Sequence, residues 1–156
     1  MNYIIREMYK NEYYLLKDFL YEAIFQPTKN KASKDIVNHP SLKIYFENFG
    51  DLKDDYSFCA LIDEKIIGAV WVRNINGFGK IDNSTPELSI SLYEEYRNLG
   101  IGTSLIKRIL EFLKTKNYKQ VSLSVQKENP ALNLYLRLGF KIILDLEEEV
   151  IMKYEL

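Results

Sequence analysis

Two glycines and an arginine stand together in segment 96–103 (YRNLGIGT), where the apolar pattern changes from strand-like to helical. The first turn of a helix leaves several backbone N–H groups without acceptors, and the helix dipole adds partial positive charge there. Gly100 and Gly102 let a backbone approach a bulky anion without a Cβ in the way. Arg97 contributes a full positive charge and Thr103 a hydroxyl. The segment therefore predicts a loop that binds a phosphate or pyrophosphate.

Two common phosphate-binding loops do not fit this segment. A P-loop has a lysine directly after its last glycine, but Gly102 is followed by Thr103. The dinucleotide-binding fingerprint has a third glycine at the position occupied here by Leu105. The alternative is that the glycines only shape an ordinary turn between a strand and a helix.

The rest of the second half resembles one enzyme family. The pattern R-x-x-G-x-G at 97–102 resembles the acyl-CoA signature of the GNAT superfamily of N-acyltransferases. The stretch NPALNLY at 129–135, followed by LGF at 138–140, resembles the second signature of that family. The stretch TPEL at 85–88 matches the way the central strand of the family often begins. The resemblance covers about residues 56–154 in the right element order and, more loosely, the N-terminal strand and helices.

The resemblance implies a fold and a way to bind acetyl-CoA. The fold is α/β: a mixed, mostly antiparallel sheet with helices on both faces, whose central strands, 88–92 and 120–126, splay apart at one end. The thioester would lie in that gap, and the pantetheine amides would pair with the first of these strands like an added strand. The pyrophosphate would rest on the amides at the start of the following helix. The implied cofactor-binding residues are Ile90, Leu92, Arg97, Asn98, Leu99, Gly100, Ile101, Gly102, Thr103, Asn129 and Tyr135.

Aminolysis of a thioester requires a neutral amine and a proton for the leaving thiolate. The resemblance implies that Tyr135 is the general acid, since a phenol at neutral pH still carries its proton. Its alternative is a place in the core, because it shares a helical stripe with three apolar residues, Ala131, Leu134 and Leu138. Developing negative charge on the carbonyl oxygen would be held by a strand N–H such as that of Leu92.

A base is also required, because an alkylammonium titrates at about pH 10.4. Glu87 begins the central strand, where some members of the family place a carboxylate that acts through water, so it is the candidate general base. The alternative is a solvated glutamate at a strand end. Asp82 is a weaker candidate, whereas Glu94 and Glu95 are expected to be solvated turn residues.

Apolar periodicity predicts the elements that position these groups. Helices are expected at 11–25, 42–48, 101–113 and 129–138, with a polar loop over 28–33. Strands are expected at 3–6, 56–62, 66–74, 88–92, 120–126, 140–144 and 150–154. This order indicates one domain over 1–156, with one mixed sheet and helices on its faces.

Composition narrows the class of protein. A net charge of −1 over 156 residues offers no basic field for nucleic acid. There is one cysteine, Cys59, expected as a buried thiol, so no intramolecular disulfide is possible, and the single histidine, His39, is expected at the surface or as a helix cap. Trp71 belongs either to the core or to the acceptor groove. No metal site, signal peptide or membrane span is expected, which predicts a cytoplasmic protein. A monomer or homodimer is expected, and the sequence leaves the choice open.

The sequence thus predicts an acetyl-CoA-dependent N-acetyltransferase that acts by direct transfer on a small amine or amino-acid-like acceptor. Segments 13–48 and 74–82 are expected to form the acceptor pocket. A second hypothesis is an acyl-CoA-binding module that has lost catalysis and acts as a sensor or scaffold. A third is a nucleotide- or RNA-binding domain with a fortuitous glycine loop, which the charge balance disfavours. O-acyl transfer stays open.

Overall fold

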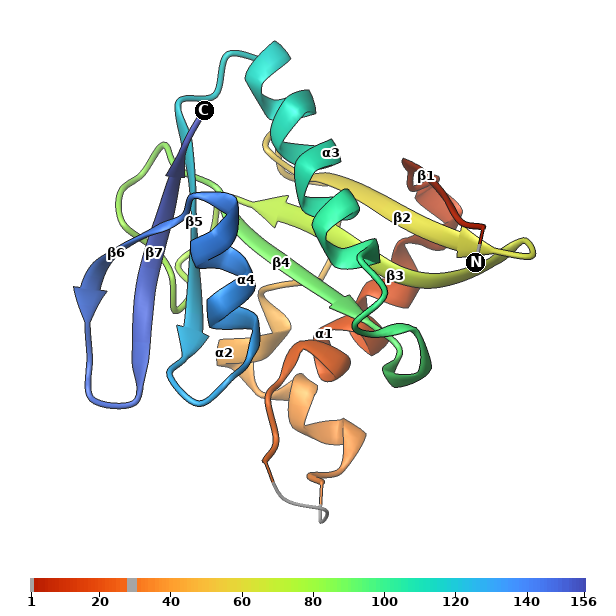
Figure 1. The fold of residues 1–156 in the computed structure, drawn as a ribbon, viewed down its shortest axis with the longest axis horizontal. Helices are drawn as coiled ribbons and strands as arrows, with labels where there is room; N and C mark the ends of the chain where they lie inside the picture. The colour runs from red at the N-terminus through yellow and green to blue at the C-terminus, as the bar shows by residue number, and fades with distance from the viewer. Residues whose placement is uncertain (1, 28–30) are drawn as a thin grey trace.

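The computed structural model describes residues 2–27 and 31–156 (Figure 1). Positions 28–30 of the predicted loop over 28–33 therefore lie outside the described residues. The helical segments are η1 (Lys10–Leu15), α1 (Leu16–Ala23), η2 (Lys34–Asn38), α2 (Pro40–Lys43), η3 (Glu94–Tyr96), α3 (Ile101–Thr115) and α4 (Ala131–Leu138), where η denotes a 3-10 helix. The strands are β1 (Ile4–Glu7), β2 (Tyr56–Ile62), β3 (Lys65–Arg73), β4 (Glu87–Leu92), β5 (Gln120–Gln126), β6 (Lys141–Asp145) and β7 (Glu149–Glu155).

The strands form one sheet in the order β1-β2-β3-β4-β5-β7-β6. All neighbours are antiparallel except β4 and β5, which are parallel. That central pair meets at a single position, Glu87 opposite Ser122, and the two strands then diverge. Helices α3 and α4 cover one face of the sheet and α1 and α2 the other (Figure 1). The predicted mixed sheet with splayed central strands is confirmed.

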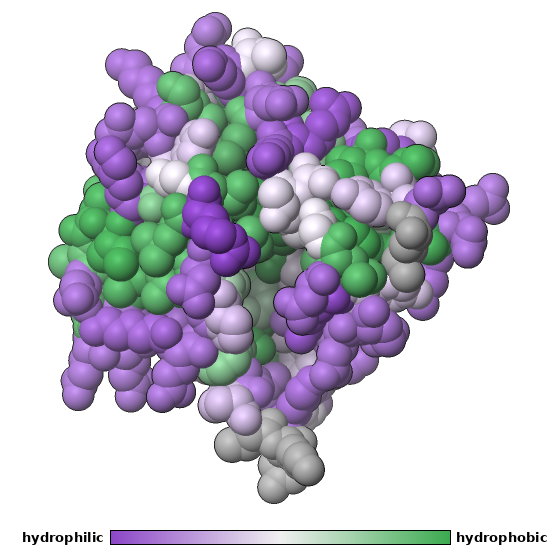
Figure 2. Space-filling view, viewed as in Figure 1, coloured by the Kyte–Doolittle hydropathy of each residue, from purple (hydrophilic) through white to green (hydrophobic). Residues whose placement is uncertain are grey.

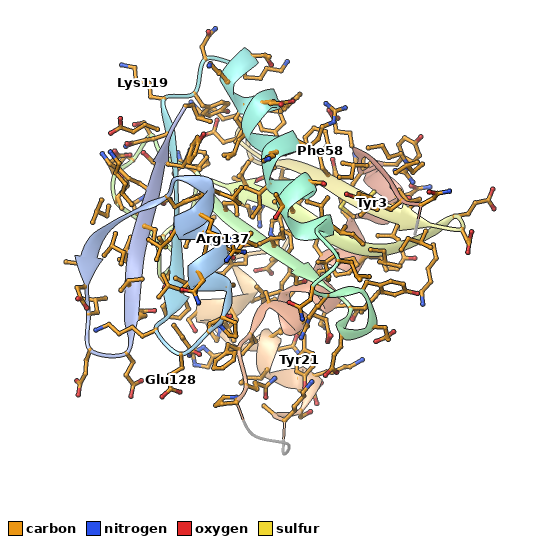
Figure 3. All side chains as sticks on the ribbon, viewed as in Figure 1. Tyr3, Tyr21, Phe58, Lys119, Glu128 and Arg137 are labelled. Carbon is orange, nitrogen blue, oxygen red and sulfur yellow. The ribbon has the colours of Figure 1, made fainter. Side chains whose placement is uncertain are left out.

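The sheet is buried on both faces because β2 and β3 are apolar almost throughout. Phe58 and Ala60 pack on the α3 side, whereas Cys59 and Leu61 pack on the α1 side, as the period of two in a strand requires. Figure 3 shows Phe58 beside α3 and Tyr21 on the opposite side with α1. Helix α3 contributes an apolar stripe of fully buried residues, Ile101, Leu105, Ile106, Ile109 and Leu113. Each such side chain stabilises the fold by about 1.5–3 kcal/mol relative to an exposed one.

The first predicted helix begins differently. Residues 10–15 form the 3-10 helix η1, and only 16–23 are α-helical. The Glu12 carboxylate accepts the Tyr9 N–H at 2.7 Å and pairs with Arg6 at 2.8 Å, which fixes a tight first turn. The helix ends at Ala23, before Pro27, because Ile24 has an extended backbone. The Tyr21 hydroxyl donates to the Ala32 carbonyl, and the Ala32 N–H donates to the Gln26 side chain.

The second predicted helix, 42–48, is wrong in its bounds, since α2 spans only Pro40–Lys43. His39 caps it by accepting the Ser41 N–H, which confirms its expected capping role. The helical ladder ends early because the buried Arg73 guanidinium takes the carbonyl oxygens of Ile44 and Glu47 at 3.0 and 2.7 Å. Residues 44–50 therefore continue as turns.

An apolar patch lies on the outer edge of the sheet. Every residue of the edge strand β6 is exposed. Figure 2 shows apolar side chains gathered over this edge and the neighbouring α4. The exposed large apolar residues there are Leu136, Ile142, Ile143, Leu144 and Leu146. Within residues 2–27 and 31–156, no helix has the length and apolar character needed to cross a bilayer.

Candidate active site

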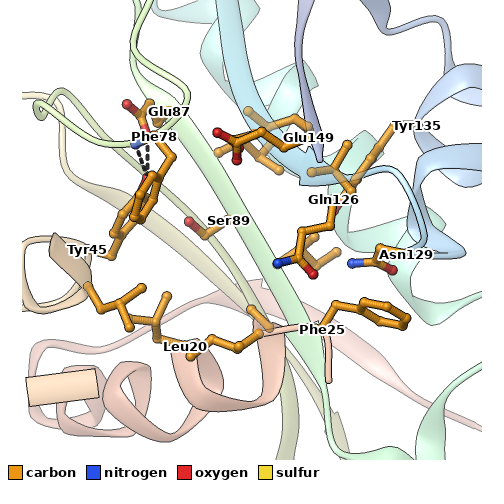
Figure 4. Close-up of a pocket in the computed structure, with 18 residues that line it drawn as sticks. Leu20, Phe25, Tyr45, Phe78, Glu87, Ser89, Gln126, Asn129, Tyr135 and Glu149 are labelled. Atoms are coloured by element: carbon orange, nitrogen blue, oxygen red, sulfur yellow. Dashed lines mark hydrogen bonds between the residues drawn. The ribbon is translucent and has the colours of Figure 1, made fainter. Parts of the chain in front are cut away.

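The divergence of β4 and β5 opens a cavity of about 310 Å³ (Figure 4). Its walls come from α1 and the following segment, from α2, from the loop after β3, and from β4, β5, β7 and α4. The lining residues are Leu20, Ala23, Ile24, Phe25, Leu42, Tyr45, Phe78, Glu87, Leu88, Ser89, Ile90, Leu123, Ser124, Val125, Gln126, Asn129, Tyr135 and Glu149. The cavity therefore joins the two faces of the sheet through the gap between its central strands.

The two faces of β5 give the cavity two chemically different sides. Val121, Leu123 and Val125 belong to the core under α3. The alternate residues, Ser122, Ser124 and Gln126, face the α1 side. Because the register sets Glu87 opposite Ser122 and Glu149 opposite Gln126, both carboxylates share this polar face.

Glu87 is held in a buried hydrogen-bond network and is 3% exposed. Its Oε2 accepts the Tyr45 hydroxyl at 2.8 Å, and its Oε1 accepts the Gly77 N–H at 3.1 Å. Burial raises the pKa of Glu87 above its usual value, although these hydrogen bonds oppose the shift. A carboxylate with a raised pKa inside a cavity has the character of a general base. The solvated alternative for Glu87 is therefore wrong.

Two glycines make this network possible. A Cβ on Gly77 would lie 2.3 Å from the Tyr45 Oη and 2.4 Å from the Glu87 Oε2. A Cβ on Gly79 would lie 2.8 Å from the backbone of β5 at Leu123. The loop after β3 thus packs tightly against both the carboxylate and the neighbouring strand, which only glycine allows at these positions.

Tyr45 is fixed from several directions. Its hydroxyl accepts the Phe78 N–H at 2.8 Å, and its ring stacks on that of Phe78 with centroids 6.4 Å apart. The Tyr45 carbonyl accepts the Trp71 indole N–H at 2.9 Å. Trp71 itself is fully buried and does not line the cavity, so it belongs to the core rather than to the acceptor groove.

Tyr135 reaches the cavity from α4, on the face opposite Glu87. The side chain is 8% exposed, and its hydroxyl has no hydrogen-bond partner among the described residues. Desolvation raises the pKa of Tyr135 to about 12. The ring also packs against Phe140, so the side chain belongs to the core and lines the cavity at once.

Asn129 shapes the start of α4. Its Oδ1 accepts the Ala131 N–H at 2.9 Å, and its carbonyl accepts the Leu132 N–H at 3.1 Å. The helix begins at Ala131, and Pro130 occupies the position before it, where a missing N–H costs little. Asn129 lines the cavity, which agrees with a place beside a ligand.

The edge of β4 that faces the gap is left without a strand partner. Tyr93 donates its N–H to Ile67 on β3, whereas the Pro86 carbonyl accepts the Ser122 N–H on β5. Since strand residues alternate in direction, the backbone groups of Ile90 and Leu92 point toward β5, which has already diverged. These are the two positions where the sequence predicts pantetheine.

The start of α3 presents free donors close to this edge. None of the N–H groups of residues 98–103 donates to an acceptor within the described part of the chain. Asn98 and Gly100 have φ values of 62° and 83°, a left-handed backbone that favours Gly and Asn. A Cβ on Gly102 would meet nothing closer than Leu92 Cδ1 at 3.7 Å and Ile90 Cδ1 at 3.9 Å, so the protein itself does not require glycine there.

The Arg97 side chain was expected to contribute its positive charge to the phosphate-binding loop, but in the structure it is bound to other parts of the chain. Its Nε donates to the Leu92 carbonyl at 3.0 Å, and its Nη2 donates to the Glu22 carbonyl at 3.2 Å. It thus ties the end of β4 to the end of α1, and it lies outside the cavity together with Leu92 and residues 98–103.

The other candidates do not line the cavity. The exposed Asp82 carboxylate accepts hydrogen bonds from Ser84 and Gln120, and Glu94 and Glu95 are exposed, as expected. Cys59 is fully buried on the α1 side, as expected, and burial raises its pKa to about 11. Among the described residues no group of His, Cys, Asp and Glu is arranged to hold a metal ion.

Several cavity residues were not identified from the sequence. Glu149 stands in the run EEE at 147–149, which has the pattern of a solvated turn, yet it accepts the Ser124 hydroxyl at 2.7 Å inside the cavity. Tyr45 was one aromatic among many in the expected acceptor region. The closely spaced glycines in NGFG at 76–79 are the signal that would have indicated that the backbone of this loop packs closely against neighbouring residues.

Comparison with known proteins agrees with this geometry. The model of the acetyltransferase (GNAT) family matches residues 17–140. An uncharacterized N-acetyltransferase YobR of Bacillus subtilis is 32% identical over 130 residues, which cover 82% of this chain and 45% of that protein. An N-alpha-acetyltransferase of Sulfurisphaera tokodaii is 38% identical over 93 residues, 54% of this chain and 55% of that protein. The chain thus spans about half the length of these curated relatives.

Solved structures show the same fold. The PaiA N-acetyltransferase of Thermoplasma acidophilum, in complex with coenzyme A, superposes with a TM-score of 0.73 at 20% identity over the whole of both chains. An acetyltransferase of the GNAT family from Streptococcus pneumoniae gives 0.69 at 18% identity, over 99% of this chain and 100% of that one. With a family model matched over most of its length, and with a cleft between splayed central strands, this chain belongs to the GNAT family of acetyltransferases.

Proposed function

We propose that the protein transfers the acetyl group of acetyl-CoA directly to the nitrogen of a small-molecule amine. The observation that carries the proposal is the cavity between β4 and β5, which has Glu87 on one side and the unpartnered Tyr135 hydroxyl on the other. A binding module without catalysis has no need of a buried carboxylate and a buried phenol in the same cavity.

The residues present fit coenzyme A. The free N–H groups at the start of α3 would hold the pyrophosphate, and the backbone groups of Ile90 and the N–H of Leu92 on the open edge of β4 would pair with the pantetheine amides, since the Leu92 carbonyl already accepts from Arg97. The room around the Gly102 Cα supports a close backbone approach by a bulky anion. Bound acetyl-CoA supplies an acyl group activated as a thioester. The chain's own residues position the reactants, take a proton from the amine and give one to the leaving sulfur.

Glu87 acts first, on the acceptor. A protonated amine has no lone pair for attack, so Glu87 takes a proton from it through water. The amine nitrogen then forms a bond to the acyl carbon while the carbon–sulfur bond breaks, and the nitrogen releases its second proton to water as the amide forms. The Leu92 N–H, on the open edge of β4, faces the gap in which charge develops on the carbonyl oxygen.

Tyr135 acts on the leaving sulfur. Because its pKa is about 12, the phenol is protonated at neutral pH and can donate that proton to the thiolate, after which the phenolate takes a proton from water. Its hydroxyl has no partner within the described protein, so no existing hydrogen bond has to be broken.

A test of this proposal combines turnover with one matched pair of variants. Purified protein is incubated with acetyl-CoA and a panel of amines, amino acids and short peptides, and acetylated products are identified by mass spectrometry. Tyr135→Phe is expected to lower kcat about 100-fold or more, with little change in coenzyme A affinity by calorimetry. Tyr154→Phe is the control, because Tyr154 contacts the same Phe140 ring without lining the cavity. Full turnover by Tyr135→Phe would remove the acid role.

An α-amino group is the second candidate acceptor. The relative from Sulfurisphaera tokodaii and another from Saccharolobus solfataricus, 34% identical over 93 residues, are named N-alpha-acetyltransferases. The peptides in the same panel decide between the candidates, since acetylation of peptide N-termini alone would overturn the small-molecule acceptor.

A further inference from the structure

The part of the cavity on the α1 side carries negative charge without a matching cation. Glu87 and Glu149 both line it, and none of the described lining residues is Lys, Arg or His. Neither carboxylate forms an ion pair within the described chain. Lys80 lowers the pKa of Glu87 less than the neighbouring hydrogen bonds do, and it does not line the cavity. Low-dielectric walls lined by one sign of charge concentrate the opposite charge.

The two carboxylates occupy separate places along the gap. Glu87 lies at the level of Ser122, whereas the Glu149 carboxylate is held at Ser124 by a hydrogen bond of 2.7 Å. The offset of two residues corresponds to about 7 Å along β5. Figure 4 shows Glu87 and Glu149 projecting from the two sides of the opening. The cavity can therefore bind two positively charged groups at once, one beside each carboxylate.

The surface around the carboxylates is apolar and aromatic. Leu20, Phe25 and Leu42 line one side, and the stacked rings of Tyr45 and Phe78 line another. Such walls accommodate methylene groups rather than further polar groups. On the far side the cavity is lined by Tyr135, a residue that is 8% exposed and whose hydroxyl has no hydrogen bond within the described chain, and this marks the end where the reactants meet.

From this arrangement we propose that the acceptor is an aliphatic diamine or polyamine. One nitrogen is acetylated under the influence of Glu87, and a second, still cationic nitrogen is bound by Glu149, with the methylene chain along the apolar walls. Glu149 is thus a specificity-determining residue. The inference rests on the proposed acetyl transfer and goes beyond it by naming the acceptor class. Amino acids are disfavoured, because an acceptor carboxylate would face two glutamates and no cation in the described lining.

The test compares acceptors that differ only in the distal group. Steady-state kinetics with acetyl-CoA are measured for 1,4-diaminobutane, for butylamine, which lacks the second cation, and for 4-aminobutyrate, which replaces it with an anion. The diamine is expected to have the highest kcat/KM, at least about tenfold above butylamine, mainly through a lower KM. The aminobutyrate is expected to be the poorest of the three.

Glu149→Gln isolates the contribution of the second carboxylate. The variant keeps an oxygen for the Ser124 hydroxyl but loses the charge. Its KM for the diamine is expected to rise about tenfold, which removes the advantage over butylamine. Glu147→Gln is the matched control, since Glu147 is exposed in the turn between β6 and β7 and does not line the cavity. Its kinetics are expected to equal those of the unaltered protein.

The outcomes separate the two levels of the proposal. If acetylated amines form but butylamine or a peptide N-terminus is preferred, or Glu149→Gln leaves the diamine preference intact, the diamine inference is wrong and acetyl transfer stands. If no amine in the panel is acetylated although coenzyme A binds by calorimetry, the proposed function itself is wrong.

Discussion

Glu87 owes its chemistry to contacts from outside its own strand. Its carboxylate is surrounded by Tyr45, by the Gly77 N–H and by the loop that Gly79 presses against β5. Motif reasoning located Glu87 because the stretch TPEL at 85–88 begins the central strand. Its burial was not predictable, since it depends on a tyrosine 42 residues earlier, in the turns that follow α2 and that Arg73 holds.

The raised pKa of Glu87 predicts a particular pH profile. Catalysis needs the ionised carboxylate, so activity should rise with pH through a value above that of an ordinary glutamate. In Glu87→Gln, kcat is expected to fall about 100-fold or more, and this limb of the profile is expected to disappear. The measurement is kcat/KM against pH.

Asp82→Asn is the control for that experiment. Asp82 precedes β4 but is exposed and lies outside the cavity, so its variant should keep the profile of the unaltered protein. A profile that changes with Asp82→Asn and not with Glu87→Gln would reassign the base.

Tyr45 is predicted to be a positioning residue for that base. Its hydroxyl favours the ionised form of Glu87, so removing it leaves burial less opposed and raises the Glu87 pKa further. In Tyr45→Phe the rising limb of kcat/KM against pH should move to higher pH. If the rising limb stayed at the same pH and activity fell equally at every pH, Tyr45 would only line the cavity and would not position the base.

At the scale of elements, the start of α3 shows what glycine spacing can and cannot reveal. Gly100 has a left-handed backbone that the turn itself requires, so its presence says nothing about a ligand. Gly102 has an ordinary helical backbone and room for a Cβ, so nothing within the protein demands glycine there. The sequence pattern presented the two residues as equivalent, and only the structure separates them.

This difference predicts opposite effects for two alanine variants. Gly102→Ala should raise the free energy of unfolding by up to about 1 kcal/mol, because alanine is the better helix residue. The same methyl group should weaken coenzyme A binding about tenfold, since it occupies the approach to the pyrophosphate. Thermal unfolding without ligand and calorimetry with coenzyme A measure the two effects.

Gly100→Ala is the counterpart. The left-handed backbone at this position should lower the free energy of unfolding of the alanine variant by about 1–2 kcal/mol.

The Gly102→Ala prediction also has an outcome that contradicts it. If that variant bound coenzyme A with unchanged affinity, the pyrophosphate would not lie at the start of α3.

Element types were predictable where a single face carried an apolar stripe, as in α3, or where alternation was clean, as in β5. Helix ends were not, because they depend on tertiary contacts. Arg73 takes the carbonyls that a longer α2 would need, and Glu12 tightens the first turn of η1. The divergence of β4 and β5 came from family resemblance rather than from periodicity, which is the same for paired and unpaired strands.

At the scale of the whole molecule, the sheet ends in an edge strand that is available to pair with another strand. Strand β6 has an open edge and exposed apolar residues. Such an edge can pair with another copy of itself. Sedimentation velocity over a range of concentrations is expected to show reversible self-association, and Leu144→Lys should reduce it.

Leu52→Lys provides the comparison, because Leu52 is similarly exposed but lies in a turn away from any strand edge. Equal sedimentation of both variants at every concentration would show that β6 is not the surface that associates.

Cys59 has a practical consequence for experiments on this molecule. It is the only sulfhydryl in the sequence, it is fully enclosed, and its pKa of about 11 leaves almost no thiolate at neutral pH. A colorimetric reagent for sulfhydryls would therefore report coenzyme A liberated from the acetyl donor, with almost no background from the native protein. A cysteine introduced at an exposed site would likewise be the only position to take up a fluorophore, so ligand-induced movement could be followed without removing the natural residue.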